Sequence, residues 1–262
     1  MKLQILNISL SFMLLTYAIE VTAQVAGVSS NKLTLLSATI LPVGTFEFEP
    51  AFVVLNSRNA FNENWKSIKQ PGQNTSSSLD FRMTAGLTEN FEMGASISSN
   101  TEEILVGAKY LVFQSDELGF GLSGGTSLPA GNRFLADSAI THEFIYKLSF
   151  GSIVTYNFSD DNSIDIAVIY TAPVGENDLS DQIYAGLGWG YLIQRNFQFI
   201  VEVAGYVCLD QEICSSKLSL FPGITYDVTD NFSFALGFQH DLIGKNEENA
   251  FGYFAAFTIS IN

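Results

Sequence analysis

The sequence predicts an all-β fold, a transmembrane up-and-down antiparallel β-barrel of about twelve strands. Three observations support this prediction: apolar residues recur at every second position, short and long connections alternate along the chain, and the second face of each strand carries small and charged residues. Such alternation indicates strands, since successive side chains of a strand point to opposite faces. Beyond residue 23, no apolar run reaches the roughly 18 residues that a membrane-spanning helix needs.

The alternation defines the expected strands one by one. In the last segment, apolar residues at odd positions alternate with mostly small or polar residues at even positions. Each segment has about the ten residues that a tilted strand needs to cross a bilayer, and an even count brings both ends of the barrel to one side. The expected strands cover residues 44–55, 77–87, 91–98, 103–113, 118–127, 149–158, 163–172, 182–193, 197–207, 216–226, 231–242 and 250–260.

The connections are of two kinds that alternate along the chain. Tight polar turns are expected at 87–90, 114–117, 159–162, 194–196 and 227–231, where Asn and Asp suit a sharp reversal of the backbone. Longer loops are expected at 56–76, 98–103, 129–148, 173–181, 208–215 and 243–249. This order predicts tight turns and both termini on the periplasmic rim. Within 129–148, residues 140–146 fit either a loop or the upper part of a strand.

The second face of the strands distinguishes a membrane barrel from a soluble β-sandwich. It carries glycines, as at Gly186, Gly188 and Gly190, where the exposed face of a soluble protein would carry lysines and longer polar chains. Charged residues on this face are candidates to line the lumen, either as solvated side chains or paired across neighbouring strands. These candidates are Glu47, Glu49, Asp80, Arg82, Glu92, Lys109, Asp165 and Glu202.

Aromatic residues cluster beside the expected tight turns. Phe91, Phe158, Phe197, Tyr226 and Phe232 occupy such positions. Outer-membrane barrels carry aromatic girdles where the strands meet the membrane interface, so this placement favours the membrane reading.

The N-terminus has the pattern of a secretion signal. Met1-Lys2 precedes a mostly apolar stretch at 5–19, and Val21-Thr22-Ala23 places small residues before a cleavage position. We therefore expect a signal peptide at 1–23, an N-terminal periplasmic segment at 24–38 and the barrel at 39–262. The expected location of the mature chain is the cell outer membrane.

The charge and the cysteines limit the chemistry further. The net charge is −15 and the 12 basic residues form no run, so nucleic acid is not an expected partner. Cys208 and Cys214 are disulfide candidates in an oxidising compartment, and a metal site is the disfavoured alternative because no His has ligand spacing nearby. No cofactor is expected.

Several short motifs carry a resemblance to a known family. They are Leu41-Pro42-Val43-Gly44, Leu128-Pro129-Ala130-Gly131, the turn at 86–94, and the hairpin at 239–246 followed by Phe251-Gly252. With these motifs the chain resembles the outer-membrane barrel family named for transporters of the meta-pathway of phenol degradation, over most of residues 33–262. The resemblance implies the barrel fold, the outer membrane and passage of small aromatic compounds. The end of the signal is similar to those of secreted proteins of Bacteroidota, which are Gram-negative.

The residues offer little support for catalysis. The histidines are His142 and His240, and His240-Asp241 is read as an acid beside a histidine at the loop rim in preference to half of a catalytic triad. We therefore expect no enzyme, and a channel or transporter for small solutes, hydrophobic or aromatic ones among them. The alternatives are a non-conducting surface, adhesin-like or structural barrel and, with least support, an outer-membrane enzyme. The expected partners are outer-membrane lipid, the barrel-assembly machinery and a small-molecule solute.

Overall fold

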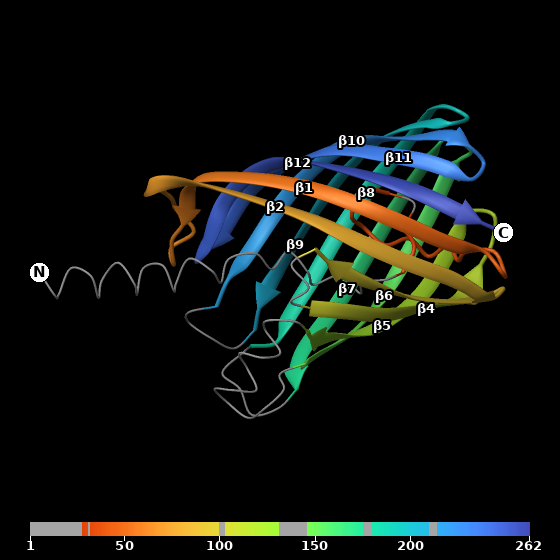
Figure 1. Ribbon diagram of the computed structural model, residues 1–262, viewed down its shortest axis with the longest axis horizontal. Coiled ribbons are helices and arrows are strands. Elements are labelled where there is room, and N and C mark those ends of the chain that lie inside the picture. Colours follow the sequence, from red (N-terminus) through yellow and green to blue (C-terminus); the bar gives the residue numbers. More distant parts are fainter. Residues whose placement is uncertain (1–27, 31, 100–102, 131–145, 175–179, 210–213) are drawn as a thin grey trace, which may run out of the picture.

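The described part of the chain forms one closed barrel (Figure 1). The computed structural model describes residues 28–30, 32–99, 103–130, 146–174, 180–209 and 214–262. Within these ranges every strand pairs antiparallel with its neighbours in sequence, and β1 pairs with β12 to close the barrel. The predicted fold class and strand count are confirmed. The expected signal peptide and His142 lie outside the described residues. No helix among the described residues is long and apolar enough to cross a membrane.

The strands agree closely with those expected from the alternation. Their bounds are β1 Phe46–Phe61, β2 Ser67–Thr88, β3 Phe91–Ser98, β4 Glu103–Gln114, β5 Leu118–Pro129, β6 Tyr146–Ser159, β7 Asn162–Val174, β8 Gln182–Gln194, β9 Phe197–Cys208, β10 Ser216–Thr229, β11 Phe232–Lys245 and β12 Glu247–Ile261. The turns after β2, β4, β6, β8 and β10 form what we call the turn rim, where β1 begins and β12 ends. The opposite end is the loop rim.

Two of the expected long loops are wrong, because the structure pairs them as strands. Most of 56–76 extends the hairpin of β1 and β2, with Asn56 opposite Thr75 and Phe61 opposite Ser67. The Thr75 hydroxyl donates to the Asn56 side chain at 2.9 Å. Polar side chains therefore support the strand pairing here, where the sequence has no alternation of apolar residues from which strands could be predicted. In the expected loop 243–249, β11 and β12 are separated by Asn246 alone.

The outer surface of the barrel is apolar. Phe150 and Tyr253 are each 62% exposed, whereas the carboxylates of Glu92 and Glu202 are fully buried on the inner side. This arrangement inverts that of a soluble protein and suits contact with lipid, since the outward residues of a membrane barrel form an apolar band.

Aromatic side chains gather near the turn rim. Their rings pack along one strand in Tyr156–Phe158 and Trp189–Tyr191, and across neighbouring strands in Phe197–Tyr226 and Phe232–Phe257. The girdle expected beside the tight turns is therefore present as contacting pairs.

The hydrophobic core lies inside the barrel and is formed around the chain's own N-terminal segment. Leu35, Leu36 and Ala38 are at most 3% exposed and pack against inward-facing residues of the strands. The described residues of 24–38, expected in the periplasm, thus lie in the barrel interior. Figure 1 shows this part of the chain in red within the ring of strands.

A tight turn leads the chain from the interior into β1. Gly44 has φ +83°, a conformation that glycine adopts without strain, and Thr45 donates its amide to the Pro42 carbonyl at 3.0 Å. Gly44 and Thr45 also exchange backbone hydrogen bonds of 2.9 Å with Gly86 of β2. A Cβ at Gly86 would collide with the carbonyls of Leu41 and Pro42, so glycine is required for this close approach.

Candidate functional site: the plugged barrel interior

The candidate site is the barrel interior together with the segment that fills it. We call the described residues 28–30 and 32–41 the N-terminal plug. The plug has no regular secondary structure, and its backbone and polar side chains bond to charged residues on β2, β3, β4, β7 and β9. Since irregular backbone buried in a protein must have its polar groups satisfied, the inner wall has to supply these partners.

Glu92 of β3 and Lys109 of β4 hold both ends of the plug. These side chains are opposite in the ladder, are fully buried and form an ion pair of 3.2 Å. Glu92 accepts hydrogen bonds from the amides of Ser29 at 2.6 Å and Leu41 at 2.8 Å. The Lys109 ammonium donates to the carbonyls of Ser29 at 2.9 Å and Ser37 at 3.0 Å. The two ends of the plug therefore meet at one carboxylate, as in a compact Ω-loop.

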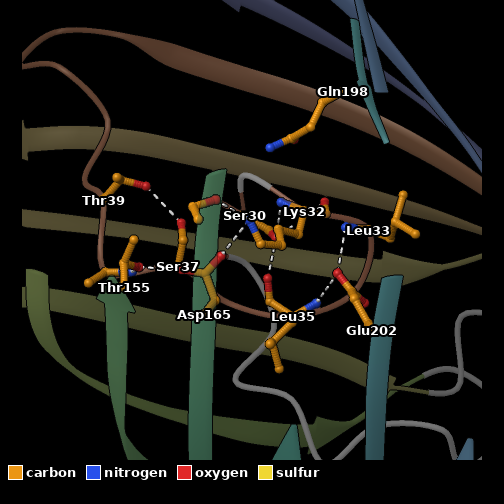
Figure 2. Close-up of polar contacts among 12 residues, drawn as sticks. Ser30, Lys32, Leu33, Leu35, Ser37, Thr39, Thr155, Asp165, Gln198 and Glu202 are labelled. Atoms are coloured by element: carbon orange, nitrogen blue, oxygen red, sulfur yellow. Dashed lines mark hydrogen bonds and ion pairs between the residues drawn. The ribbon is translucent and has the colours of Figure 1, made fainter. Parts of the chain in front are cut away.

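Glu202 of β9 binds the middle of the plug (Figure 2). Its carboxylate accepts the amides of three successive residues, with closest distances of 2.8 Å to Leu33, 3.0 Å to Thr34 and 3.4 Å to Leu35. The Thr34 hydroxyl adds a fourth donor at 2.5 Å. Successive backbone amides form a concave anion-binding nest, which explains how a fully buried carboxylate is accommodated without a cation beside it.

Asp165 of β7 forms the third attachment (Figure 2). The Lys32 ammonium lies 3.1 Å from the Asp165 carboxylate and donates to the Ser163 hydroxyl at 2.7 Å. Asp165 also accepts the hydroxyl of Thr155 on β6, and Thr155 accepts the Ala38 amide at 2.8 Å. Lys32 and Asp165 are both almost completely buried, so this pair is desolvated, and removing either partner would leave a buried charge.

An apolar cluster surrounds these polar attachments. Leu35 of the plug is fully buried, as are Ile153 of β6 and Ile169 of β7, and Tyr184 and Phe221 complete the cluster. Interior contact of this kind contributes through the hydrophobic effect, roughly 1.5–3 kcal/mol for each large side chain fully buried. The plug is thus held by apolar packing as well as by charge.

The predicted lumen residues face the interior, and five of them contact the plug. These are Arg82, whose guanidinium donates to the Val28 carbonyl, together with Glu92, Lys109, Asp165 and Glu202. Glu49 pairs with Arg82 at 2.8 Å. Glu47 accepts the Ser260 hydroxyl at 3.4 Å, and Asp80 accepts that of Ser78 at 3.4 Å. The last three have no described contact with the plug.

Sequence reasoning missed two parts of this interior. Lys32 was not expected there, because no periodicity marks an irregular segment. A second buried cluster near the loop rim was also missed: Lys217 lies 3.6 Å from Asp241 and 3.9 Å from Glu247. The alternation in 231–242 could have found Asp241, which shares the parity of Gln239 on the inner face.

The cysteines and His240 lie apart from the plug. The structure joins Cys208 and Cys214 by a disulfide with the two Cα atoms 6.0 Å apart, beside the loop rim. His240 is exposed on the outer face and stacks on Phe238, while Asp241 is buried on the inner face. Adjacent strand residues point in opposite directions, so this pair does not form two members of a triad. The described residues contain no cluster of three or more His, Cys, Asp or Glu suited to a metal ion.

Similar solved structures have the same fold. An outer-membrane channel from Pseudomonas putida F1 superposes with a TM-score of 0.71 at 11% identity, covering 88% of this chain and 100% of that chain. The KdgM porin gives 0.52 at 8% identity, covering 83% and 99%, and the NanC porin 0.50 at 9% identity, covering 79% and 98%. At these identities the likeness concerns the fold alone. No curated protein matches the sequence.

A family model covers nearly the whole barrel. The family described as "Putative MetA-pathway of phenol degradation" matches residues 12–258. This match includes the plug, the turn at 42–45 and all but the last residues of β12. The chain therefore belongs to this family of outer-membrane β-barrels, as its motifs predicted.

Proposed function

We propose that this protein is an outer-membrane channel for small solutes whose lumen is closed by its own N-terminal plug. The observation that carries the proposal is the separation of wall and plug. The ladder of backbone hydrogen bonds is complete around the barrel without the plug. Among the described residues, the plug is attached by side-chain and backbone contacts to the inner face and by the turn at 42–45. Its displacement would open a path while leaving the wall intact.

The polar character of the attachments supports displacement. The carboxylates of Glu92, Asp165 and Glu202 bind plug amides or, for Asp165, the Lys32 ammonium, and all of these are groups that water can solvate. An apolar outer face, an aromatic girdle and a closed sheet fit a bilayer, so we place the barrel in the outer membrane, surrounded by lipid and inserted by the barrel-assembly machinery.

The solutes that we propose are small and include hydrophobic or aromatic ones. The family description supports aromatic compounds. The interior supports them as well, because Ile153, Ile169, Tyr184 and Phe221 would line the lumen vacated by Leu35 and Leu36. Catalysis has no part in this proposal.

The alternative is a non-conducting structural or surface barrel. The complete burial of the plug favours this alternative. Leu35 is 0% exposed, and a plug that is packed so tightly could serve as a permanent core.

Conductance in planar bilayers distinguishes the two functions. We expect single-channel conductance of the full mature chain to be small or intermittent, and a variant lacking residues 24–41 to conduct at least about tenfold more, because the plug no longer fills the lumen. The control is Asp230→Asn, an exposed change on the turn rim. Heat-modifiable migration on gels verifies that each barrel is closed. Closed barrels without conductance or solute uptake in either form would establish the non-conducting alternative.

A further inference from the structure

Strand β8 presents no side chains to the interior along the middle of its length. Gly186, Gly188 and Gly190 occupy its inward positions. In the ladder, Gly188 is opposite Asp165 on one side and Glu202 on the other. The three residues thus form a row across the wall in which a side-chain-free strand lies between two carboxylates. We call this recess the glycine trough.

The side chain of Lys32 occupies the glycine trough at Gly188 and Gly190, and a methyl group of Leu35 occupies it at Gly186. A Cβ built on Gly188 would lie 3.1 Å from Lys32 Cδ and 3.2 Å from a Leu35 methyl, and one on Gly190 would lie 2.7 Å from the Lys32 ammonium. Gln198 bounds the trough at Gly190, where its amide would collide with any added Cβ (Figure 2). The recess therefore has the width of a methylene chain and places its polar end beside Asp165.

The wall does not neutralise these two carboxylates by itself. Among the described residues, Asp165 pairs with the cation of Lys32 and keeps only the Thr155 hydroxyl from the wall. The described donors to Glu202 all belong to the plug, at residues 33–35. By contrast, Glu92 has Lys109 and Glu49 has Arg82 as partners on the wall itself. Displacing the plug would therefore uncover two carboxylates, those of Asp165 and Glu202, at this recess.

We propose that the glycine trough is a binding site for small organic cations with a primary ammonium and a short alkyl chain, and that Lys32 occupies it as a tethered ligand. The entry of a free solute rests on the displaceable plug proposed above. An alkylammonium would place its chain on Gly188 and Gly190 and its ammonium between Asp165 and Ser163, as Lys32 does. A carboxylate of the same length would meet two like charges, and an alcohol would lose the charge attraction.

Binding to a variant with an empty trough tests the site directly. The full mature chain with Lys32→Ala, in detergent, is titrated calorimetrically with n-butylammonium, which matches the lysine side chain. We expect the variant to bind butylammonium saturably and at least about tenfold more tightly than the unsubstituted protein does. We also expect the variant to bind 1-butanol at least about tenfold more weakly than butylammonium, and not to bind butyrate. Adding Asp165→Asn or Glu202→Gln to Lys32→Ala should weaken butylammonium binding by about tenfold or more.

Matched variants separate the trough from general effects on folding. Lys32→Met keeps a chain in the trough without its charge and should prevent butylammonium binding. Gly188→Ala, combined with Lys32→Ala, should weaken binding by narrowing the recess, whereas Gly124→Ala, with only the Ser149 carbonyl near its added Cβ at 3.6 Å, should not. Heat-modifiable migration shows that each variant is folded.

The outcomes distinguish the site from the channel. Equal binding of butanol and butylammonium, or binding insensitive to Asp165 and Gly188, would overturn the proposed site. Bilayer recordings of the same Lys32→Ala protein test the channel separately. Butylammonium binding without conductance in any form would refute the proposed channel and support the proposed site. Conductance without such binding would refute the proposed site alone.

Discussion

Glu92 and Lys109 show how single residues fix the position of the plug in the barrel interior. Their charges are fully buried, and each is satisfied by the other and by plug backbone atoms. A buried pair of this kind is costly to break from one side, because the remaining charge has no compensation. Specificity for one plug position follows from the number of hydrogen bonds that converge on these two side chains, which Glu92 accepts and Lys109 donates.

Loss of one partner should therefore loosen the barrel interior. We expect Lys109→Met to lower the free energy of unfolding by about 3 kcal/mol, since Glu92 is left without its cation. The double variant Lys109→Met, Glu92→Gln should recover part of this loss. The measurement is the denaturant midpoint of the folded band on semi-native gels. Lys69→Met, an exposed change on β2, is the control, and equal midpoints for it and Lys109→Met would refute the role assigned to the pair.

Parity along the strands assigned the charged wall residues to the inner face but could not identify their partners. Glu92, Asp165 and Glu202 were assigned to the inner face because they alternate with apolar residues. Their plug partners are 63 residues away for Glu92 and Ser29 and 169 for Glu202 and Leu33, in a segment without periodicity. Contacts so remote in sequence leave no local signal when one side is irregular.

At the scale of elements, the strands followed the apolar alternation, and the errors lie where that alternation stops. The upper parts of β1 and β2 are polar, so their residues resembled a loop, yet the ladder continues through them. At the same rim, beside the tip of β1, β11 passes into β12 through Asn246, whose φ is +51°. Asparagine is among the few non-glycine residues that adopt such dihedrals, and this permits a reversal without a loop.

Substitutions at Asn246 should separate backbone strain from side-chain loss. We expect Asn246→Gly to keep the stability of the original, and Asn246→Val to lower it by about 1–2 kcal/mol, because a β-branched residue is strained at positive φ. Thermal conversion of the folded to the unfolded gel band gives the comparison. A valine variant as stable as the glycine variant would contradict the assigned conformation.

The molecule as a whole is a closed sheet with its apolar face outward and its core supplied by the chain that precedes it. This inversion was predictable, because the glycines, the other small residues and the charged residues all occupy the same face of the strands. The filled interior was not, since the same parity is compatible with a water-filled lumen. The plug replaces the water that wall carboxylates such as Glu202 would otherwise need.

The outward face should tolerate charge only near its rims. Phe150, exposed on β6, lies opposite Gly124 and Tyr170, well away from both ends of its strand. We expect Phe150→Lys to destabilise the folded barrel in lipid bilayers by about 2–4 kcal/mol, the cost of a lysine near the middle of a membrane. Val228→Lys, at the turn rim, should cost less than about 1 kcal/mol. Denaturant titration in liposomes measures both, and equal costs would contradict a lipid-facing belt.

The joining of both plug ends at Glu92 has a mechanical and a kinetic consequence. A pull on the chain before Val28 would load the Val28–Arg82 hydrogen bond first, then the Ser29 contacts, and then those of Lys32 and the residues bound to Glu202. The other end would stay covalently tied to β1 through the turn held by Gly86. A displaced segment therefore remains attached to its own barrel, and its return is an intramolecular step whose rate is independent of protein concentration.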